Sequence, residues 1–419
     1  MKASSRPKPK HFRTWLHEPF LERASDTERG EGRYALGAFL TLRLADRFRA
    51  GEDPGHPLAL AYQTKATRDY LMSLEPETPE VGHLLEIVRL AEAIQQGGTR
   101  DLLWAPLLAY GFWLEERLNL TEALDVVETA LGLADGTAPD KEIAGLLQHG
   151  RVLRLLGLFD LARKSYRAAR KKAAAVGDTH SVLLGRIGDA IVMRQVGNLR
   201  ASERALRKIL KEARAAGDRD AEARARHDLG AVYNDMGRAH QAIAHLYKAF
   251  ELYERHAHKI RALSDVGEAL KQEGRYQAAR DAFMLVLAGQ PQEEMRVCTM
   301  IALLELSGRM GDRVGFARWK REISAVVGEL PAERAADFHL QLGIAAAAFG
   351  QRRAAERALR HALRIADEHH LHHYGARARA ALAGMRKRGA PEAAADASGA
   401  KASAVFLRIE RKLHALRAS

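Results

Sequence analysis

Residues 229–249 read LGAVYNDMGRAHQAIAHLYKA, and this stretch predicts two helices joined at a glycine. Gly237 separates two helix-forming runs, a position where a left-handed residue ends a helix without steric cost. Gly230 lies seven residues before it and Ala242 five residues after it. Small residues at fixed helical positions let two antiparallel helices approach closely, and a large residue such as Leu246 fills the seam. The stretch therefore predicts a helical hairpin.

The interhelix glycine recurs at a nearly fixed interval along the chain. Its copies are Gly157, Gly197, Gly237, Gly274, Gly311 and Gly350, with spacings of 40, 40, 37, 37 and 39 residues. Other positions keep the same register: Gly150, Gly230, Gly267 and Gly343 seven residues before; Ala162, Ala242, Ala279 and Ala355 five after; Tyr166, Leu206, Leu246, Phe283 and Leu359 nine after; Ala169, Ala249 and Ala362 twelve after. A single hairpin cannot bury its apolar face alone, so we expect the hairpins to stack.

This spacing of small and large residues resembles the tetratricopeptide repeat family, in a variety with a longer period of about 37–40 residues. The resemblance covers about residues 100–388. It implies an all-α fold, a right-handed α-α superhelical solenoid of about seven tetratricopeptide-like hairpins. Three copies depart from the pattern: Phe316 and Ser202 replace the expected alanine, and a degenerate first copy over Leu102–Asp135 would put Arg117 in the glycine position.

The segments outside the repeats are less regular. We expect residues 1–33 to form a basic, flexible N-terminal tail, and residues 34–99 to form three helices that are either divergent repeats or a cap. Residues 389–404 are small, polar and aperiodic, which predicts a flexible linker.

Residues 405–419 predict a basic amphipathic helix at the end of the chain. One face carries Val405, Phe406, Ile409, Leu413 and Leu416. We expect this helix to cap the last repeat. The alternatives are docking on a membrane surface, on a partner, or in the chain's own groove.

Composition bounds the function. The 419 residues carry a net charge of +13, and the pI is near 9.8, so acidic partners are favoured. The single cysteine, Cys298, sits in an apolar helical run and fits a reducing compartment. The sequence shows no secretory signal and no apolar run long enough for a membrane span, so we expect a cytoplasmic protein.

Motifs that would indicate catalysis do not occur. The sequence has no P-loop and no Gly-x-Ser-x-Gly, so we expect neither an enzyme nor a cofactor. His369, His370, His372 and His373 form the one cluster that invites a metal, because histidines three or four residues apart share a helix face. The simpler interpretation is a polar loop that closes the last repeat, so no metal site is predicted.

The family resemblance also implies which side chains line the concave groove, namely those on the first helix of each hairpin. Carried over to this chain, the partner-binding residues are Arg151, Arg154, Arg194, Arg224, His227, Asn234, Arg261 and Lys271. Arginine can grip carboxylates through paired hydrogen bonds, and an asparagine can hold a peptide backbone. The alternative is that several of these arginines pair with acids of neighbouring repeats.

These observations predict a non-catalytic scaffold or adaptor for protein binding, which holds a peptide or protein segment, in particular an acidic one, in the groove. One alternative is a peptide-responsive regulatory sensor with the C-terminal helix as lid or output. A second is a basic protein associated with nucleic acid, although the chain has few aromatic residues for base stacking.

Overall fold

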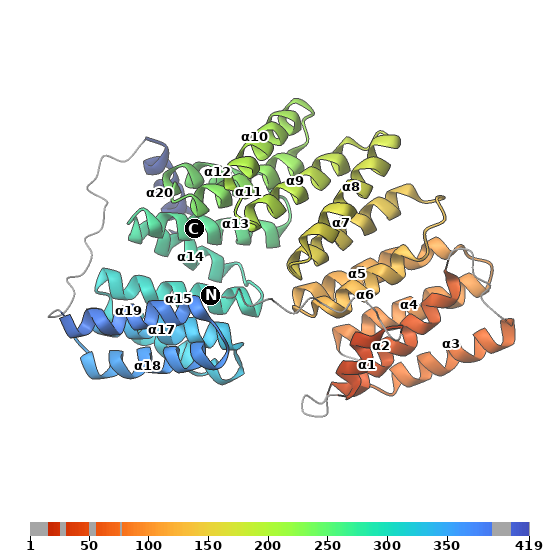
Figure 1. Cartoon of the computed structure of the whole chain (residues 1–419), viewed down its shortest axis with the longest axis horizontal. Helices are drawn as coiled ribbons and strands as arrows, with labels where there is room; N and C mark the ends of the chain where they lie inside the picture. Colours follow the sequence, from red (N-terminus) through yellow and green to blue (C-terminus); the bar gives the residue numbers. More distant parts are fainter. Residues whose placement is uncertain (1–15, 26–30, 50–55, 76–77, 388–403, 419) are drawn as a thin grey trace, which may run out of the picture. The chain divides into compact units, whose positions relative to one another are not determined.

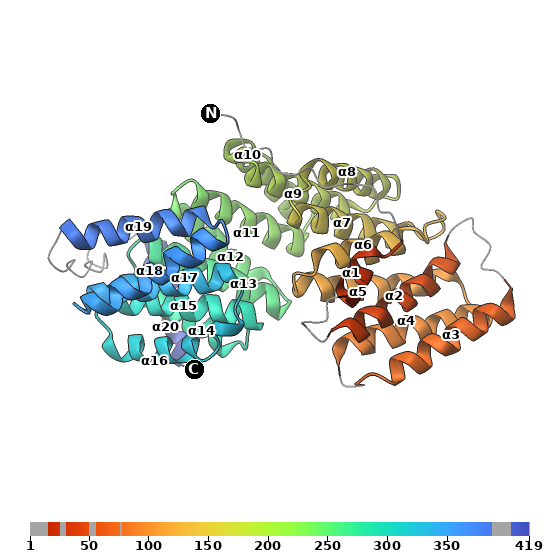
Figure 2. The same cartoon turned by 60° about the horizontal axis from the view of Figure 1, so that its bottom comes forward.

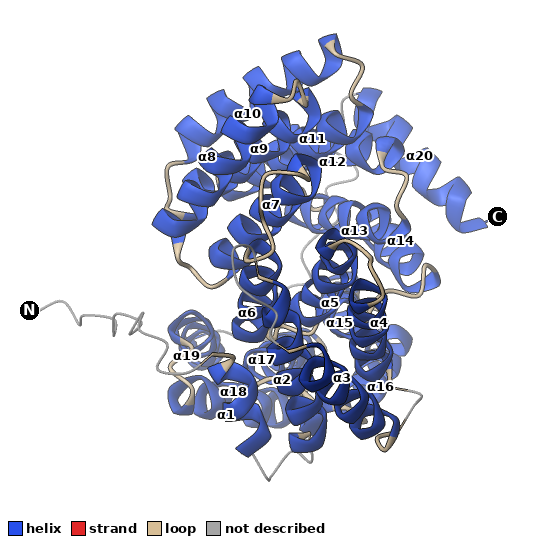
Figure 3. Ribbon diagram, turned by 90° about the vertical axis from the view of Figure 1, so that its right-hand side faces the viewer, coloured by secondary structure: helices blue, strands red, loops and turns tan. Residues whose placement is uncertain are grey.

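The computed structural model describes residues 16–25, 31–49, 56–75, 78–387 and 404–418, and the chain divides into two compact units, Met1–Gly197 and Asn198–Ser419 (Figure 1). All regular secondary structure in these ranges is helical, as the colouring of Figure 3 shows. None of the described helices is both long and apolar enough to cross a bilayer. Each unit is described by itself below.

The first unit contains helices of two kinds, an irregular N-terminal group and regular hairpins. The N-terminal helices are α1 (Glu18–Ser25), α2 (Gly32–Ala45), α3 (Pro57–Met72) and α4 (Pro79–Gln95), with 3-10 turns at Asp46–Phe48 and Arg100–Leu103. They are followed by α5 (Trp104–Glu116), α6 (Leu120–Leu131), α7 (Pro139–Leu155), α8 (Phe159–Ala175) and α9 (Thr179–Gln195). Helices α5 with α6 and α7 with α8 form hairpins, and α8 packs on α9.

The prediction of a flexible tail over residues 1–33 is wrong for α1. Phe20 is fully buried against Tyr110, with ring centroids 6.3 Å apart. The His17 ring is clamped between two carboxylates, with Nδ1 2.6 Å from Asp125 and Nε2 3.1 Å from Asp46. Burial alone would lower the pKa of His17, but the two aspartates outweigh it and raise the pKa to about 9. Among the eight residues of α1, Phe20 is the one buried apolar residue. A single such residue forms no periodic pattern from which a helix could be predicted.

The second unit is a regular stack. Its helices are α10 (Leu199–Ala215), α11 (Arg219–Asp235), α12 (Ala239–Leu252), α13 (His256–Gln272), α14 (Tyr276–Ala288), α15 (Glu293–Met310), α16 (Arg313–Ser324), α17 (Ala332–Ala348), α18 (Arg352–Glu368), α19 (His372–Lys387) and α20 (Ala404–Ala418), with a 3-10 turn at Val327–Glu329. Hairpins form between α11 and α12, α13 and α14, α15 and α16, and α17 and α18 (Figure 2).

The predicted seam of small and large residues is present in both units. A Cβ added at Gly150 would lie 2.7 Å from the Tyr166 ring, and one at Gly230 would lie 2.5 Å from Leu246. The glycine seven residues before the turn and the large residue nine after it therefore touch within one hairpin. This close approach confirms the predicted all-α solenoid of helical hairpins.

The register of the degenerate first copy needs a correction of one residue. The left-handed residue between α5 and α6 is Leu118, with φ 64°, and not Arg117. From Leu118, Gly111 and Ala123 fall seven residues before and five after, as in the other copies. Because the turn lacks a glycine, the most visible marker of the register is missing from the sequence.

Candidate functional site

The eight predicted groove residues are divided between the two units. Arg151 and Arg154 lie on α7 and Arg194 on α9, all in the first unit. In the second unit Arg224, His227 and Asn234 lie on α11, and Arg261 and Lys271 lie on α13. Each set is considered within its own unit.

In the first unit, the predicted residues on α7 tie neighbouring helices together. The Arg151 guanidinium forms an ion pair with Glu115 on α5, a carboxylate that is nearly buried. Arg154 donates from Nη1 to the side-chain oxygen of Gln195 on α9, at 3.3 Å. These contacts support the alternative that the groove cations serve packing between repeats.

In the second unit, two of the predicted residues also bridge first helices of successive hairpins. His227 on α11 places Nε2 2.6 Å from Asp265 on α13. Lys271 on α13 lies 2.8 Å from Glu305 on α15 and 2.8 Å from Glu268. Burial alone would lower the pKa of Lys271, but the two glutamates outweigh it and raise the pKa, so the pair is ionised at neutral pH.

The remaining predicted residues of the second unit differ in whether their polar groups have a partner within the protein. Arg224 forms an ion pair with Asp220 one turn away, at 2.7 Å. Arg261 is exposed and has no hydrogen-bond or ion-pair partner in the described residues. The Oδ1 atom of Asn234 is buried without a hydrogen-bond partner among them. Arg261 is therefore the predicted residue of this unit whose charged group is most open to a ligand.

The C-terminal helix α20 packs on the second helices α12 and α14 (Figure 1). This differs from the expected cap on the last repeat. On α20, Leu413 is fully buried and Ile409 is 4% exposed. We call the region that receives them the α12–α14 surface, defined by Tyr247, Glu251, Arg275 and Asp281.

The charges of α20 match those of the α12–α14 surface. Lys412 lies 2.6 Å from Glu251 and 5.4 Å from the centre of the Tyr247 ring. Arg417 forms an ion pair with Asp281, which is only 2% exposed. An ion pair of the opposite sense is also present, because the buried Arg275, which immediately precedes α14, lies 3.6 Å from Glu410 on α20. The α12–α14 surface therefore has nearly buried charges of both signs, and α20 supplies an oppositely charged partner for each.

Sequence reasoning identified α20 but did not identify the surface that holds it. A signal was present, because Asp281 stands inside the apolar helical run of residues 276–288, where a carboxylate is costly unless it is paired. The basic apolar face of residues 405–419 is the complement of such a carboxylate. Pairing the two needed the fold, because 136 residues separate Arg417 from Asp281.

The histidine cluster lies where α18 ends and α19 begins. His369 follows the last turn of α18, and His370 takes a left-handed conformation with φ 57°. Within the described ranges, no group of three or more histidine, cysteine or acidic side chains is placed to hold a metal ion.

Comparison with known proteins gives one match to a family model. A model described as tetratricopeptide repeat matches residues 189–255 and 222–292. No curated protein matches the chain.

Several solved structures align with most of the chain at low identity. The Rap conjugation gene regulator of the plasmid pLS20, in complex with the Phr* peptide, is 13% identical, covers 79% of this chain and 97% of its own, and has a TM-score of 0.49. A Rap protein complexed with competence and sporulation factor is 13% identical, with 84% and 97% covered and a TM-score of 0.47. The apo quorum sensor NprR from B. thuringiensis is 12% identical, with the same coverage and a TM-score of 0.47.

At such identities these likenesses concern the fold alone. The family model and the register of the glycines agree over the central hairpins. The tetratricopeptide repeat model matches residues 189–292, where the spacing of small and large residues also predicts such repeats.

Proposed function

We propose that this chain is a non-catalytic scaffold or adaptor that binds a protein or peptide segment on its helical repeats. One observation carries the proposal: the second unit already holds an amphipathic helix, α20, on the α12–α14 surface. Ile409 and Leu413 are buried there, and Lys412 is paired with Glu251. A repeat stack with an apolar seam and matched charges is the kind of surface that takes a helical or extended segment from another protein.

The first helices of the same unit supply the surface for such a partner. Because α20 lies on the second helices, it leaves Arg261 on α13 exposed and Asn234 on α11 half-buried. The Asn234 amide carries a donor and an acceptor, which is the pair of groups that can hold a peptide backbone. Arg261 can grip a carboxylate of the same segment.

The test compares affinity capture by three forms of the full chain. The first is wild type, the second carries Asn234→Ala with Arg261→Glu, and the third carries Arg204→Glu, an exposed arginine on the second helix α10. We expect wild type and the Arg204→Glu control to capture the same protein, and the double variant to bind that purified protein at least about tenfold more weakly.

Equal binding by all three forms would rule out the first helices as the site. Capture that disappears on nuclease treatment would support the nucleic-acid alternative instead, and its affinity would fall steeply with salt.

A second candidate function, a regulatory sensor, is favoured by the way α20 is held. Asp281 and Arg275 are nearly buried charges whose partners on α20 are lost when the helix leaves, so docked and undocked states differ in exposed charge. Deleting residues 404–419 separates the two functions. A scaffold binds its partner unchanged after the deletion, whereas a sensor inhibited by α20 binds it more tightly.

A further inference from the structure

The hairpin of α15 and α16 breaks the repeat pattern at two positions. Five residues after the interhelix glycine it has Phe316, where Ala162, Ala242, Ala279 and Ala355 are each fully buried. Nine residues after that glycine it has Lys320, where five other copies carry a large apolar residue. The positions that close the seam elsewhere therefore hold a large ring and a cation here, and such breaks often mark functional sites.

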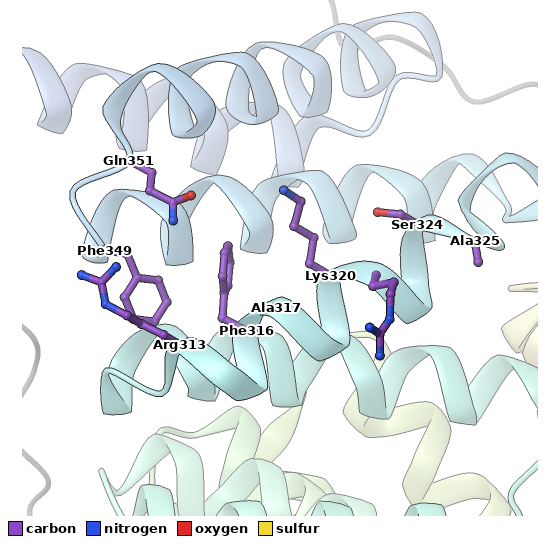
Figure 4. Close-up of a pocket in the computed structure, with 9 residues that line it drawn as sticks. Arg313, Phe316, Ala317, Lys320, Ser324, Ala325, Phe349 and Gln351 are labelled. Carbon is purple, nitrogen blue, oxygen red and sulfur yellow. The ribbon is translucent and has the colours of Figure 1, made fainter.

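These two departures coincide with a cleft, as Figure 4 shows. Helix α16 barely touches α17, although α15 packs closely against α17. A hollow of about 600 Å³ runs along α16 and is also lined by Phe349 and Gln351, and an adjoining hollow of about 290 Å³ extends to α18. The rings of Phe316 and Phe349 lie 5.1 Å apart and form an apolar floor. We call the two hollows together the α16–α18 cleft.

The charge around the α16–α18 cleft has one sign. Its cations are Arg313, Lys320, Arg321 and Arg357, and no lining residue is acidic. None of the four has an ion-pair partner in the described part of the chain. Four exposed cations around an apolar floor produce a local field that attracts anions.

Three other cations on the same two helices are neutralised by ion pairs. Arg318 pairs with Glu322 at 2.8 Å on α16, and Arg360 pairs with Glu356 at 2.7 Å on α18. Arg364 also pairs with Glu368, at 3.3 Å. The acidic side chains of α16 and α18 are thus engaged away from the cleft, and its positive charge stays unbalanced.

We propose that the α16–α18 cleft binds an acidic peptide segment that carries a bulky apolar side chain. The inference rests on the protein-binding function proposed above and names the chemistry of one partner. The carboxylates of the segment pair with the guanidinium and ammonium groups, and its apolar side chain packs on Phe316 and Phe349.

The length of the cleft favours an extended segment over a compact small molecule. Its lining runs from Arg313 to Ala325, the whole of the 12-residue helix α16, which is about 18 Å long at 1.5 Å per residue. An extended chain rises about 3.3 Å per residue, so five or six residues span the cleft.

The test measures fluorescence anisotropy with a labelled hexapeptide probe of sequence EEFEEG and two comparison peptides, QQFQQG and EEAEEG. The cleft variant of the full chain carries Lys320→Gln and Arg357→Gln. The matched control carries Arg318→Gln and Arg360→Gln, which removes the same charge from the same helices outside the cleft. Circular dichroism verifies that all variants fold.

We expect EEFEEG to bind wild type at least about tenfold more tightly than QQFQQG, the change that about 1.4 kcal/mol produces. The cleft variant should lose at least about tenfold in affinity for EEFEEG, and the control variant less than about threefold. Phe316→Ala should abolish the preference for EEFEEG over EEAEEG, because it removes half of the aromatic floor.

Two results would overturn the inference. One is no binding of EEFEEG up to a concentration of about 1 mM. The other is an equal loss in the cleft and control variants, which would mean diffuse attraction to net charge. The variant with Asn234→Ala and Arg261→Glu should keep full affinity for the probe. The peptide probe therefore tests the cleft alone, and the capture experiment with the double variant tests the first helices alone.

Discussion

Replacing Leu413 with alanine tests the docking of α20 quantitatively. Leu413 is fully buried against the α12–α14 surface, whereas Leu407 on the same helix is 47% exposed. Removing a buried leucine side chain costs about 2–3 kcal/mol at the lower end of the range for cores, because one wall of this site can relax. Leu413→Ala should therefore lower the ratio of docked to undocked α20 by about 30- to 150-fold. Leu407→Ala removes the same atoms and should change that ratio by less than about threefold.

Hydrogen exchange of the full chain measures this ratio directly. An isolated helix of 15 residues is marginally stable in water, so undocked α20 exchanges its amide protons rapidly. Protection of the amides of residues 404–418 therefore reports the docked fraction. Protection should fall about 30- to 150-fold for Leu413→Ala, while the amides of α12 keep most of theirs. An unchanged protection, or an equal fall for Leu407→Ala, would refute the assignment of Leu413 to the interface.

Four further predictions concern stability. The pKa of His17 is raised in the fold, so its stabilising charge is fully present below pH 6.5 and is lost as pH rises through about 9. The excess stability of wild type over His17→Gln in urea unfolding should thus shrink by about 3 kcal/mol between pH 6 and pH 10, and a flat difference would contradict the clamp. Gly188→Ala should destabilise the first unit by about 1–3 kcal/mol, because the new Cβ would lie 2.4 Å from the Tyr166 ring. Gly82→Ala, with nothing within 4 Å, should stabilise that unit by up to about 1 kcal/mol in the same melts. Lys271→Met should cost the second unit about 1.5–3 kcal/mol in urea unfolding, since it removes one of the two cations that pair with the buried Glu305 and leaves only Arg309, and a loss below about 1 kcal/mol would contradict the pairing.

The hairpins could be predicted from the sequence because their determinants are local. Gly230 and Leu246 are 16 positions apart and touch within one hairpin, and the same pair of positions recurs in other copies. The same spacing of residues recurs in each repeat, so it can be recognised in the sequence before the fold is known. Where the marker changes, as at Leu118, the register was misplaced by one residue although both helices were expected.

The interaction surfaces could be predicted only in part, because their determinants are distant in sequence. The family register placed Lys271 and His227 on first helices, but it could not say that Glu305 and Asp265 would neutralise them. Phe316 was visible as a departure from the pattern. Its consequence, a cleft with unpaired cations from α16 and α18, depends on how one helix is spaced from another.

The position of α20 in the sequence sets an order of events during synthesis. The surface that receives it is complete at Ala288, and α20 begins at Ala404. At about 5–20 residues per second, the ribosome finishes the surface several seconds before it makes the helix that covers it. During that interval Asp281 and the apolar seam beside it are open to any basic amphipathic helix nearby. On a message read by several ribosomes, that helix can be the finished α20 of the preceding copy, and the exchange would join two newly made chains as a swapped pair.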